Sequence, residues 1–262
     1  MSRLHFDFGC GSLKLAGSLD TAPGSTGLLI VSGGNELRSG AFSGQSLLAA
    51  RIAKAGFPVF RFDRRGIGDS EGENRGFRHS AKDIRAALDA FRALAPQVDR
   101  VIGFGNCDAA SALMLMGGEG FDGLVLSNPW TIDEDAGDTD EPQHTPEAIR
   151  SRYLEKLKNP AEIARLLRGG VNLRKLAAGL LSAAKSAPQA SQLMQEMRAG
   201  IADFSGSVTY LVATDDRTGQ LFESAWGKDD PRIQRCLGAG HAYVEPAHQD
   251  WLKDRILEVI RA

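Results

Sequence analysis

The sequence predicts an α/β fold, with a mostly parallel sheet of eight strands and helices on both faces. Three observations support this. Short, nearly continuous apolar runs alternate with amphipathic helical patterns, which is typical of a parallel sheet covered on both sides. The 262 residues, 42% of them apolar, suit one large α/β core with room for an insertion. One long helical stretch interrupts the alternation, as such an insertion would.

Eight segments have the composition of strands. The first two, at 4–8 and 13–19, are joined by a turn at Gly9–Gly11 and have the pattern of a hairpin. The other six are bounded by turn residues or helical patterns, and they lie at 27–32, 58–62, 100–105, 123–127, 208–213 and 233–237.

The helices between the strands show an apolar stripe. In the helix expected at about 80–95, Ser80 is a candidate N-cap, and Asp83 stands three residues later in capping-box spacing. Pro96 ends that helix. The last helix, expected at about 248–260, has the same periodic pattern.

The interrupting stretch, residues 131–205, contains no convincing strand. It opens with an acidic loop and continues as several helical pieces. We therefore expect a helical lid inserted after the sixth strand, and a core made of residues 1–130 and 206–262. The alternative is a solvated helical decoration with no role in a site.

Charge and cysteine content exclude several classes of protein. With 31 basic and 33 acidic residues, the net charge of -2 gives no electrostatic footprint for nucleic acid. Three scattered cysteines, Cys10, Cys107 and Cys236, indicate neither a disulfide framework nor a metal site. No apolar run is long enough for a signal peptide or a membrane span. We expect a cytoplasmic protein with no metal and no cofactor.

The segment after the fifth strand carries the chemistry. The strand ends at Gly105, and Cys107 opens a helix rich in small residues. A nucleophile on a tight strand-to-helix turn needs small neighbours, and the G-x-S-x-G pattern occurs here with cysteine at its centre, as Gly105-Asn106-Cys107-Asp108-Ala109. The alternative is that Cys107 is a small buried core residue.

A helix N-terminus favours a thiolate at Cys107, because its N–H groups are unpaired and its dipole is positive there. The charge of Asp108 opposes this effect unless its side chain turns away.

Chain order supplies the partners, since nucleophile, acid and base follow one another in this arrangement. Asp216 follows the seventh strand and is the favoured acid. Asp215 is the second candidate, and Asp133, after the sixth strand, is a distant third. His241 lies on a Gly-rich loop before the last helix, where the general base is expected.

Two loops complete the expected site. After the third strand, Gly34 or Asn35 would join the backbone N–H of Asp108 in an oxyanion hole, and a plain turn is the alternative. After the fourth strand, the segment FDRRGIGDSEG at 62–72 has the form D-x-R-G-x-G-x-S-x-G. In it we interpret Asp63, Arg65 and Ser70 as scaffold residues whose hydrogen bonds lock the loop.

Over nearly its whole length the chain resembles the α/β-hydrolase superfamily. More narrowly, it is similar to the first type of exosortase-A-system-associated hydrolase in four strings, at 31–42, 61–72, 103–113 and 216–226. This resemblance implies a bacterial origin and a role beside exopolysaccharide production, and it favours Asp216 over Asp215. Two departures are Ser32, where many relatives have histidine, and Ala109, where the pattern ends in glycine.

The leading hypothesis is cleavage of an ester or thioester through an acyl-cysteine on Cys107, with a small-molecule or carrier-bound acyl substrate. An acyltransferase with the same triad, or a catalytically silent protein that binds a ligand in the same pocket, are the alternatives. Nothing in the sequence specifies an oligomeric state.

Overall fold

The computed structural model describes residues 2–133 and 191–262 of the chain. Residues 1–131 and 192–262 form one compact unit, to which the following description refers. Most of the predicted lid, residues 134–190, lies outside the described residues. The lid and its boundaries therefore stay predictions.

All eight expected strands are present and form one sheet. Their bounds are β1 Arg3–Cys10, β2 Leu13–Asp20, β3 Thr26–Val31, β4 Val59–Phe62, β5 Arg100–Asn106, β6 Gly123–Ser127, β7 Ser207–Ala213 and β8 Ile233–Cys236. The order is β1-β2-β4-β3-β5-β6-β7-β8. β2 pairs antiparallel with β1 and with β4, and all other pairs are parallel. This is the α/β-hydrolase fold that the sequence predicts.

The strand order reverses between β3 and β5. The chain passes from β3 to β4 on one side and returns to place β5 on the other side of β3. Ligands of open α/β sheets bind at the carboxyl ends of the strands beside such a switch point. The loop after β3 and the turn after β5 both lie there, so the fold brings the predicted oxyanion loop to the predicted nucleophile.

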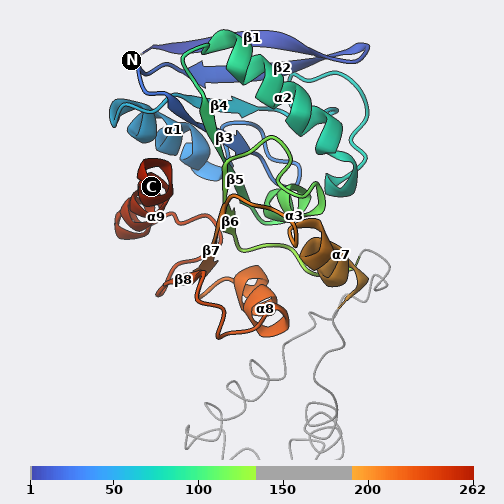
Figure 1. Ribbon diagram of the computed structural model, residues 1–262, viewed down its shortest axis with the longest axis vertical. Coiled ribbons are helices and arrows are strands. Elements are labelled where there is room, and N and C mark those ends of the chain that lie inside the picture. Colours follow the sequence, from blue (N-terminus) through green and yellow to red (C-terminus); the bar gives the residue numbers. More distant parts are fainter. Residues whose placement is uncertain (1, 134–190) are drawn as a thin grey trace, which may run out of the picture. The chain divides into compact units, whose positions relative to one another are not determined.

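Helices cover both faces of the sheet (Figure 1). Two lie on one face, α1 Gly44–Lys54 and α9 Pro246–Arg261, and three lie on the other, α2 Ala81–Leu94, α3 Asp108–Leu115 and α8 Arg217–Trp226. A further helix, α7 Gln192–Gly200, packs against α3. Two short 3₁₀ helices, Ala41–Ser43 and Phe77–His79, precede α1 and α2.

The predicted capping box of α2 is wrong. Ser80 has helical dihedral angles, because it directly continues the 3₁₀ turn Phe77–His79, and its side chain caps no N–H of the helix. Its hydroxyl instead accepts a hydrogen bond from Arg64, 3.1 Å away. The Asp83 carboxylate binds the backbone N–H and the guanidinium of Arg65. The side chains of Ser80 and Asp83 therefore make tertiary contacts and do not cap the helix.

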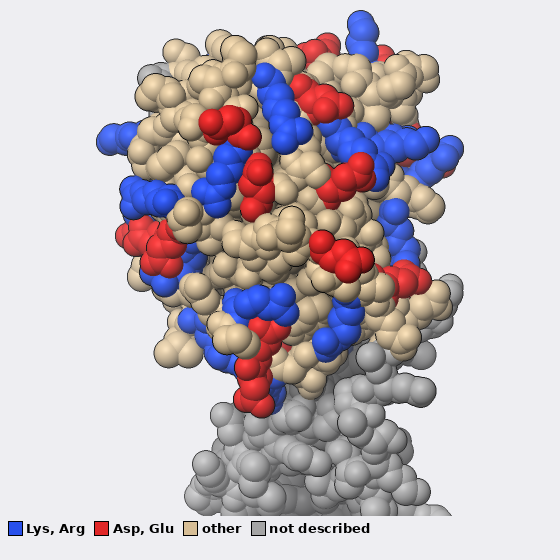
Figure 2. Space-filling model, viewed as in Figure 1, with Lys and Arg blue, Asp and Glu red and all other residues tan. Residues whose placement is uncertain are grey.

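Charged side chains of both signs lie on the described surface seen in Figure 2. Lysine and arginine side chains alternate with aspartate and glutamate on the face seen in Figure 2. Within residues 2–133 and 191–262, no helix combines the length and apolar content needed to cross a bilayer.

The β5–α3 junction depends on Gly105. A Cβ atom there would lie 2.7 Å from the carbonyl carbon of Ala109 and 2.7 Å from the backbone nitrogen of Ala110. Because these are backbone atoms, they cannot move aside as a flexible side chain can. We therefore expect Gly105→Ala to lower the free energy of unfolding by about 1 to 3 kcal/mol, the usual cost of overpacking, measured by urea denaturation.

Gly9→Ala is the matched control, because a Cβ at Gly9 meets no atom within 4 Å. Equal stability of the two variants would contradict the close approach at Gly105.

Candidate active site

Cys107 lies at the turn between β5 and α3, with φ 62° and ψ -129°. This positive φ is rare for a residue with a side chain and stores strain of order 1 to 3 kcal/mol. Gly33 makes the turn possible, because a Cβ there would lie 2.7 Å from the carbonyl oxygen of Asn106. The Cys107 side chain is half-buried, so the sulfur is not sealed in the interior.

His241 and Asp216 meet beside this turn. The Nδ1 atom of His241 lies 2.9 Å from Oδ2 of Asp216, which is buried. The Asp216 carboxylate also accepts the N–H groups of Thr218 and Gly219 at the start of α8, at 3.3 and 3.1 Å. Asp215 is exposed, and its carboxylate accepts a hydrogen bond from the Thr214 hydroxyl. The structure therefore pairs His241 with Asp216.

The pKa of His241 is raised from 6.5 to about 10. The main cause is its hydrogen bond to Asp216, followed by hydrogen bonding with the Cys107 side chain. Both partners favour the imidazolium form, and together they outweigh the opposing effect of burial. With Nδ1 directed to Asp216, Nε2 is the nitrogen left for Cys107.

The loop that carries His241 is tied to its neighbours by hydrogen bonds. The backbone N–H of Asp215 donates to the carbonyl of Ala239 at 3.0 Å, and that of Gly238 donates to the Thr214 hydroxyl at 2.8 Å. These bonds join the loop after β7 to the loop after β8, so the loops that carry Asp216 and His241 are held together.

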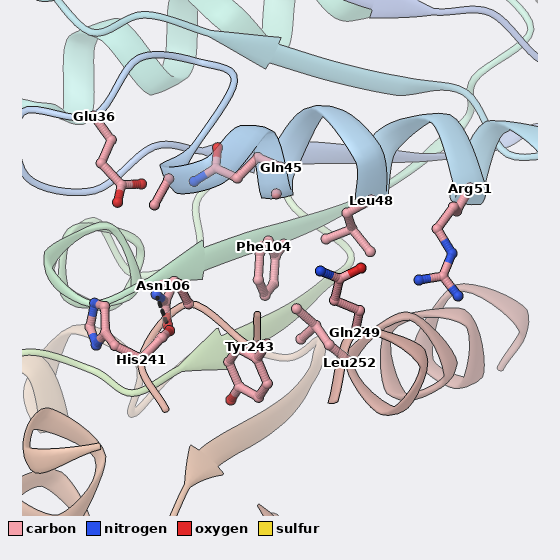
Figure 3. Close-up of a pocket in the computed structure, with 13 residues that line it drawn as sticks. Glu36, Gln45, Leu48, Arg51, Phe104, Asn106, His241, Tyr243, Gln249 and Leu252 are labelled. Carbon is pink, nitrogen blue, oxygen red and sulfur yellow. Dashed lines mark hydrogen bonds between the residues drawn. The ribbon is translucent and has the colours of Figure 1, made fainter. Parts of the chain in front are cut away.

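Two asparagines extend this support, and the sequence analysis did not identify their roles. Asn106 donates from Nδ2 to the carbonyl oxygen of His241 at 3.2 Å (Figure 3). Asn128 donates to Asn106 Oδ1 at 3.1 Å and accepts the backbone N–H of Ala213 at 2.8 Å. This chain of amides joins the ends of β5, β6 and β7 to the His241 loop. In the sequence, the Asn128-Pro129 dipeptide indicates a turn, but it does not indicate which residues the Asn128 side chain binds.

The predicted oxyanion loop lies against the turn, and one of its donors is occupied. The backbone N–H of Gly34 donates to Oδ1 of Asp108 at 2.6 Å. No hydrogen bond joins the backbone N–H of Asn35 or that of Asp108 to another residue in the described part of the chain. Of the three predicted donors, Asp108 and Asn35 are thus available without rearrangement, whereas Gly34 is not.

The charge of Asp108 is balanced by a residue that sequence analysis missed. Arg64 is only 3% exposed, and it binds Oδ2 of Asp108 at 3.3 Å and the carbonyl oxygen of Gly34. The Asp108 carboxylate therefore has its own cation. Arg64 occupies the variable position of the D-x-R-G pattern, so the pattern itself gave no signal for it.

The scaffold interpretation of the loop after β4 agrees with its hydrogen bonds. The buried Asp63 carboxylate binds the backbone N–H and the guanidinium of Arg38. The Ser70 hydroxyl donates to the Asp63 carbonyl at 2.6 Å and accepts the backbone N–H of Ala16. Arg65 pairs with the buried Asp83. These contacts fix the loop on which Arg64 stands.

Comparison with known proteins gives one family. A model described as the Alpha/beta hydrolase family matches residues 28–254. No curated protein matches the chain at a significant level.

Solved structures share the fold at low identity. They include GrgF, an alpha/beta hydrolase from Penicillium sp. sh18 (18% identity, TM-score 0.65, covering 100% of this chain and 98% of that one). The Pyrococcus furiosus esterase Pf2001 has 14% identity and a TM-score of 0.61, covering 99% of this chain and 90% of that one. Est1E from Butyrivibrio proteoclasticus, solved with ferulic acid bound, has 14% identity and a TM-score of 0.59, covering 98% and 100%.

The His241–Asp216 pair makes a prediction about titration. Because Asp216 is the main cause of the raised pKa of His241, Asp216→Asn should lower that pKa by about 1 to 3 units, as expected for losing an opposite charge at hydrogen-bond distance. NMR titration of the ring nitrogens between pH 5 and pH 10.5 measures the shift. Asp215→Asn is the control and should leave the titration unchanged; a larger effect from Asp215→Asn would reverse the assignment.

The same pKa sets the pH dependence of stability. Since the folded pKa lies above 6.5, protonated His241 stabilises the fold fully below pH 6.5. That contribution is lost as the pH rises through about 10.

The Arg64–Asp108 pair makes a prediction about stability. Asp108→Ala removes the carboxylate partner of a guanidinium that is only 3% exposed, and it also removes the acceptor of the Gly34 N–H. We expect the free energy of unfolding to fall by about 3 kcal/mol in urea denaturation, as when a buried ion pair loses one member.

Glu119→Ala is the matched control, because it breaks the exposed Arg85–Glu119 pair and should cost less than about 1 kcal/mol. Similar losses in both variants would show that Arg64 does not depend on Asp108.

Proposed function

The chain belongs to the alpha/beta hydrolase family, and on that premise we propose that it cleaves an ester or thioester through an acyl-cysteine intermediate on Cys107. The observation that carries the proposal is the half-buried sulfur on a strained turn at the carboxyl end of β5. His241, held by Asp216, is the candidate base for that sulfur.

The first half of the proposed reaction forms the thioester. The Cys107 sulfur, as the thiolate paired with the imidazolium of His241, attacks the acyl carbonyl carbon. The carbonyl π electrons move to oxygen and form a tetrahedral oxyanion. When the oxyanion collapses, the bond to the leaving oxygen or sulfur breaks, and the leaving group takes the proton from His241.

The oxyanion would lie between the Asp108 N–H at the start of α3 and a donor of the loop after β3. The backbone N–H of Asn35 can act as this donor without rearrangement. Gly34 faces the same turn, since its N–H already contacts the Asp108 side chain, and it serves if that carboxylate rotates away. In related sites one such donor contributes about 3 kcal/mol to the transition state.

The second half releases the acyl group. His241 takes a proton from water, the resulting hydroxide oxygen attacks the thioester, and Cys107 leaves as the thiolate. If an alcohol or amine replaces water, the same steps make the protein an acyltransferase. Measuring products with and without such acceptors separates hydrolysis from transfer.

The raised pKa of His241 is consistent with a cysteine at position 107, since hydrogen bonding with Cys107 is one of its causes. A histidine with a pKa of about 10 is protonated at neutral pH. The imidazolium can accompany a thiolate as a stable ion pair and then protonate the leaving group. The electrostatics around His241 thus agree with the residue at position 107.

We also propose that the substrate belongs to the bacterial cell envelope. This rests on the four strings that resemble exosortase-A-system-associated hydrolases, and it implies a role near exopolysaccharide production. An acyl group on a small molecule or a carrier is the expected substrate.

Intact-mass measurement tests the acyl-cysteine. Short- and long-chain p-nitrophenyl esters and acyl thioesters should add one acyl group to the wild-type protein and none to Cys107→Ala. Cys10→Ala is the matched control, because Cys10 is also partly exposed, and it should acylate normally.

Cys107→Ser adds a test of the nucleophile. It should acylate about 10²-fold more slowly at pH 7, because a hydroxyl depends on a general base that a thiolate does not need. Absence of an adduct on wild type, or equal adducts on wild type and Cys107→Ala, would refute the mechanism and favour a silent ligand-binding protein.

A further inference from the structure

A pocket runs from His241 along one face of α1. It lies between α1 and α9, with Phe104 and Asn106 of β5 in its wall, and has about 640 Å³ of empty space, the part open to solvent included. In Figure 3 His241 and Asn106 stand at one end and Arg51 at the other, with Leu48 between them. The pocket therefore begins at the candidate base and leads away from it.

Apolar side chains make up much of the wall of this pocket. Ala41, Leu48, Phe104, Tyr243 and Leu252 line it from four parts of the chain. Such a surface favours a hydrocarbon, because apolar area is removed from water on both partners.

Three amide side chains in the wall are hydrogen-bonded to neighbouring residues. Gln45 accepts a hydrogen bond from the Ser32 hydroxyl at 3.1 Å, and Gln249 donates to the Val244 carbonyl at 2.9 Å. Asn106 is bound to the His241 carbonyl. Glu36 lies at the same end of the pocket as His241, away from Arg51 (Figure 3). These three amides are therefore held by neighbouring residues.

An ion pair lies at the far end. Arg51 of α1 binds Asp250 of α9, so the two helices that form the walls are linked there. From Gly44 to Arg51 the helix advances about 10 Å at 1.5 Å per residue. An extended chain of single bonds advances about 1.2 Å per bond, so this length corresponds to about eight carbons.

We propose that the α1–α9 pocket is the acyl-chain site, and that the substrate carries an unbranched, unsubstituted acyl group of medium length, about eight carbons. This inference rests on the proposed acylation of Cys107 and specifies its substrate. The carbonyl lies between Cys107 and His241, the chain extends over Phe104 and past Leu48, and Arg51 with Asp250 sets the length limit.

Chain-length profiles test the site. With p-nitrophenyl esters of 2 to 14 carbons, kcat/KM should rise about fourfold for each methylene up to about eight carbons, the factor expected for burying one CH₂ group, and should fall beyond. Leu48→Trp fills the pocket and should leave the acetyl ester unaffected while lowering kcat/KM for the octanoyl ester at least tenfold. Arg51→Ala removes the end wall and should move the maximum to longer chains.

Leu47→Trp is the matched control, because Leu47 neighbours Leu48 on α1 but is 52% exposed and does not line the pocket. Its profile should equal that of wild type. Since Leu48 is buried, Ala41→Phe at the partly exposed start of the pocket provides a second obstruction if Leu48→Trp does not fold. A wild-type profile in a folded obstructed variant overturns the acyl-chain site, even when Cys107 is acylated normally.

A binding measurement tests the acyl-chain site independently of the acylation of Cys107. Octanoate should bind to Cys107→Ala in calorimetry, and adding Leu48→Trp should weaken it at least tenfold, whereas adding Leu47→Trp should not. This result with no adduct on wild-type Cys107 would refute the acylation and retain the pocket as a site for a medium-length chain. Absence of octanoate binding, or equal binding in both double variants, overturns the site.

Discussion

The backbone conformation of Cys107 constrains everything around it. With φ 62° and ψ -129°, this residue stores strain that its surroundings must offset. Gly33 and Gly105 do so by letting the backbone of the loop after β3 and that of α3 approach more closely than a Cβ would allow. Buried β5 and α3 then hold the turn from both sides. Small neighbouring residues therefore allow the sulfur to stand on the turn at the carboxyl end of β5.

Charge is distributed around this turn in separate pairs. Asp108 has Arg64 and the Gly34 N–H, while Asp216 has His241 and the first N–H groups of α8. Each carboxylate is therefore satisfied without Cys107. The partner left for a Cys107 thiolate is the imidazolium of His241, supported by the unpaired N–H groups of the α3 N-terminus. Because the charge of Asp108 is directed to Arg64, an acidic residue directly after Cys107 is compatible with the proposed thiolate.

The sequence predicts the features that depend on local pattern. Apolar runs locate all eight strands, and small residues around Cys107 locate the turn. Chain order gave the His241–Asp216 pair, but the sequence does not predict the other partners, because these are chosen in three dimensions. Arg64 and Asp108 are 44 residues apart, and Asn106 and Asn128 are 22 apart. Ser80 is a case in which the local pattern gives a wrong prediction. Its local pattern predicts a cap, but a tertiary contact with Arg64 and the preceding 3₁₀ turn decide its role.

The loop that carries His241 belongs to the proposed catalytic arrangement and also to the pocket wall. His241 and Tyr243 line the pocket, and Asn106 in the same wall donates to the His241 carbonyl. Tyr243 also contacts Ser127 at the end of β6, through hydroxyl oxygens 3.1 Å apart. A chain seated in the pocket would therefore press on the residues that fix the imidazole. Since binding energy accelerates a reaction only when it is realised in the transition state, a wall shared with the base gives the acyl chain a physical means to influence proton transfer as well as affinity.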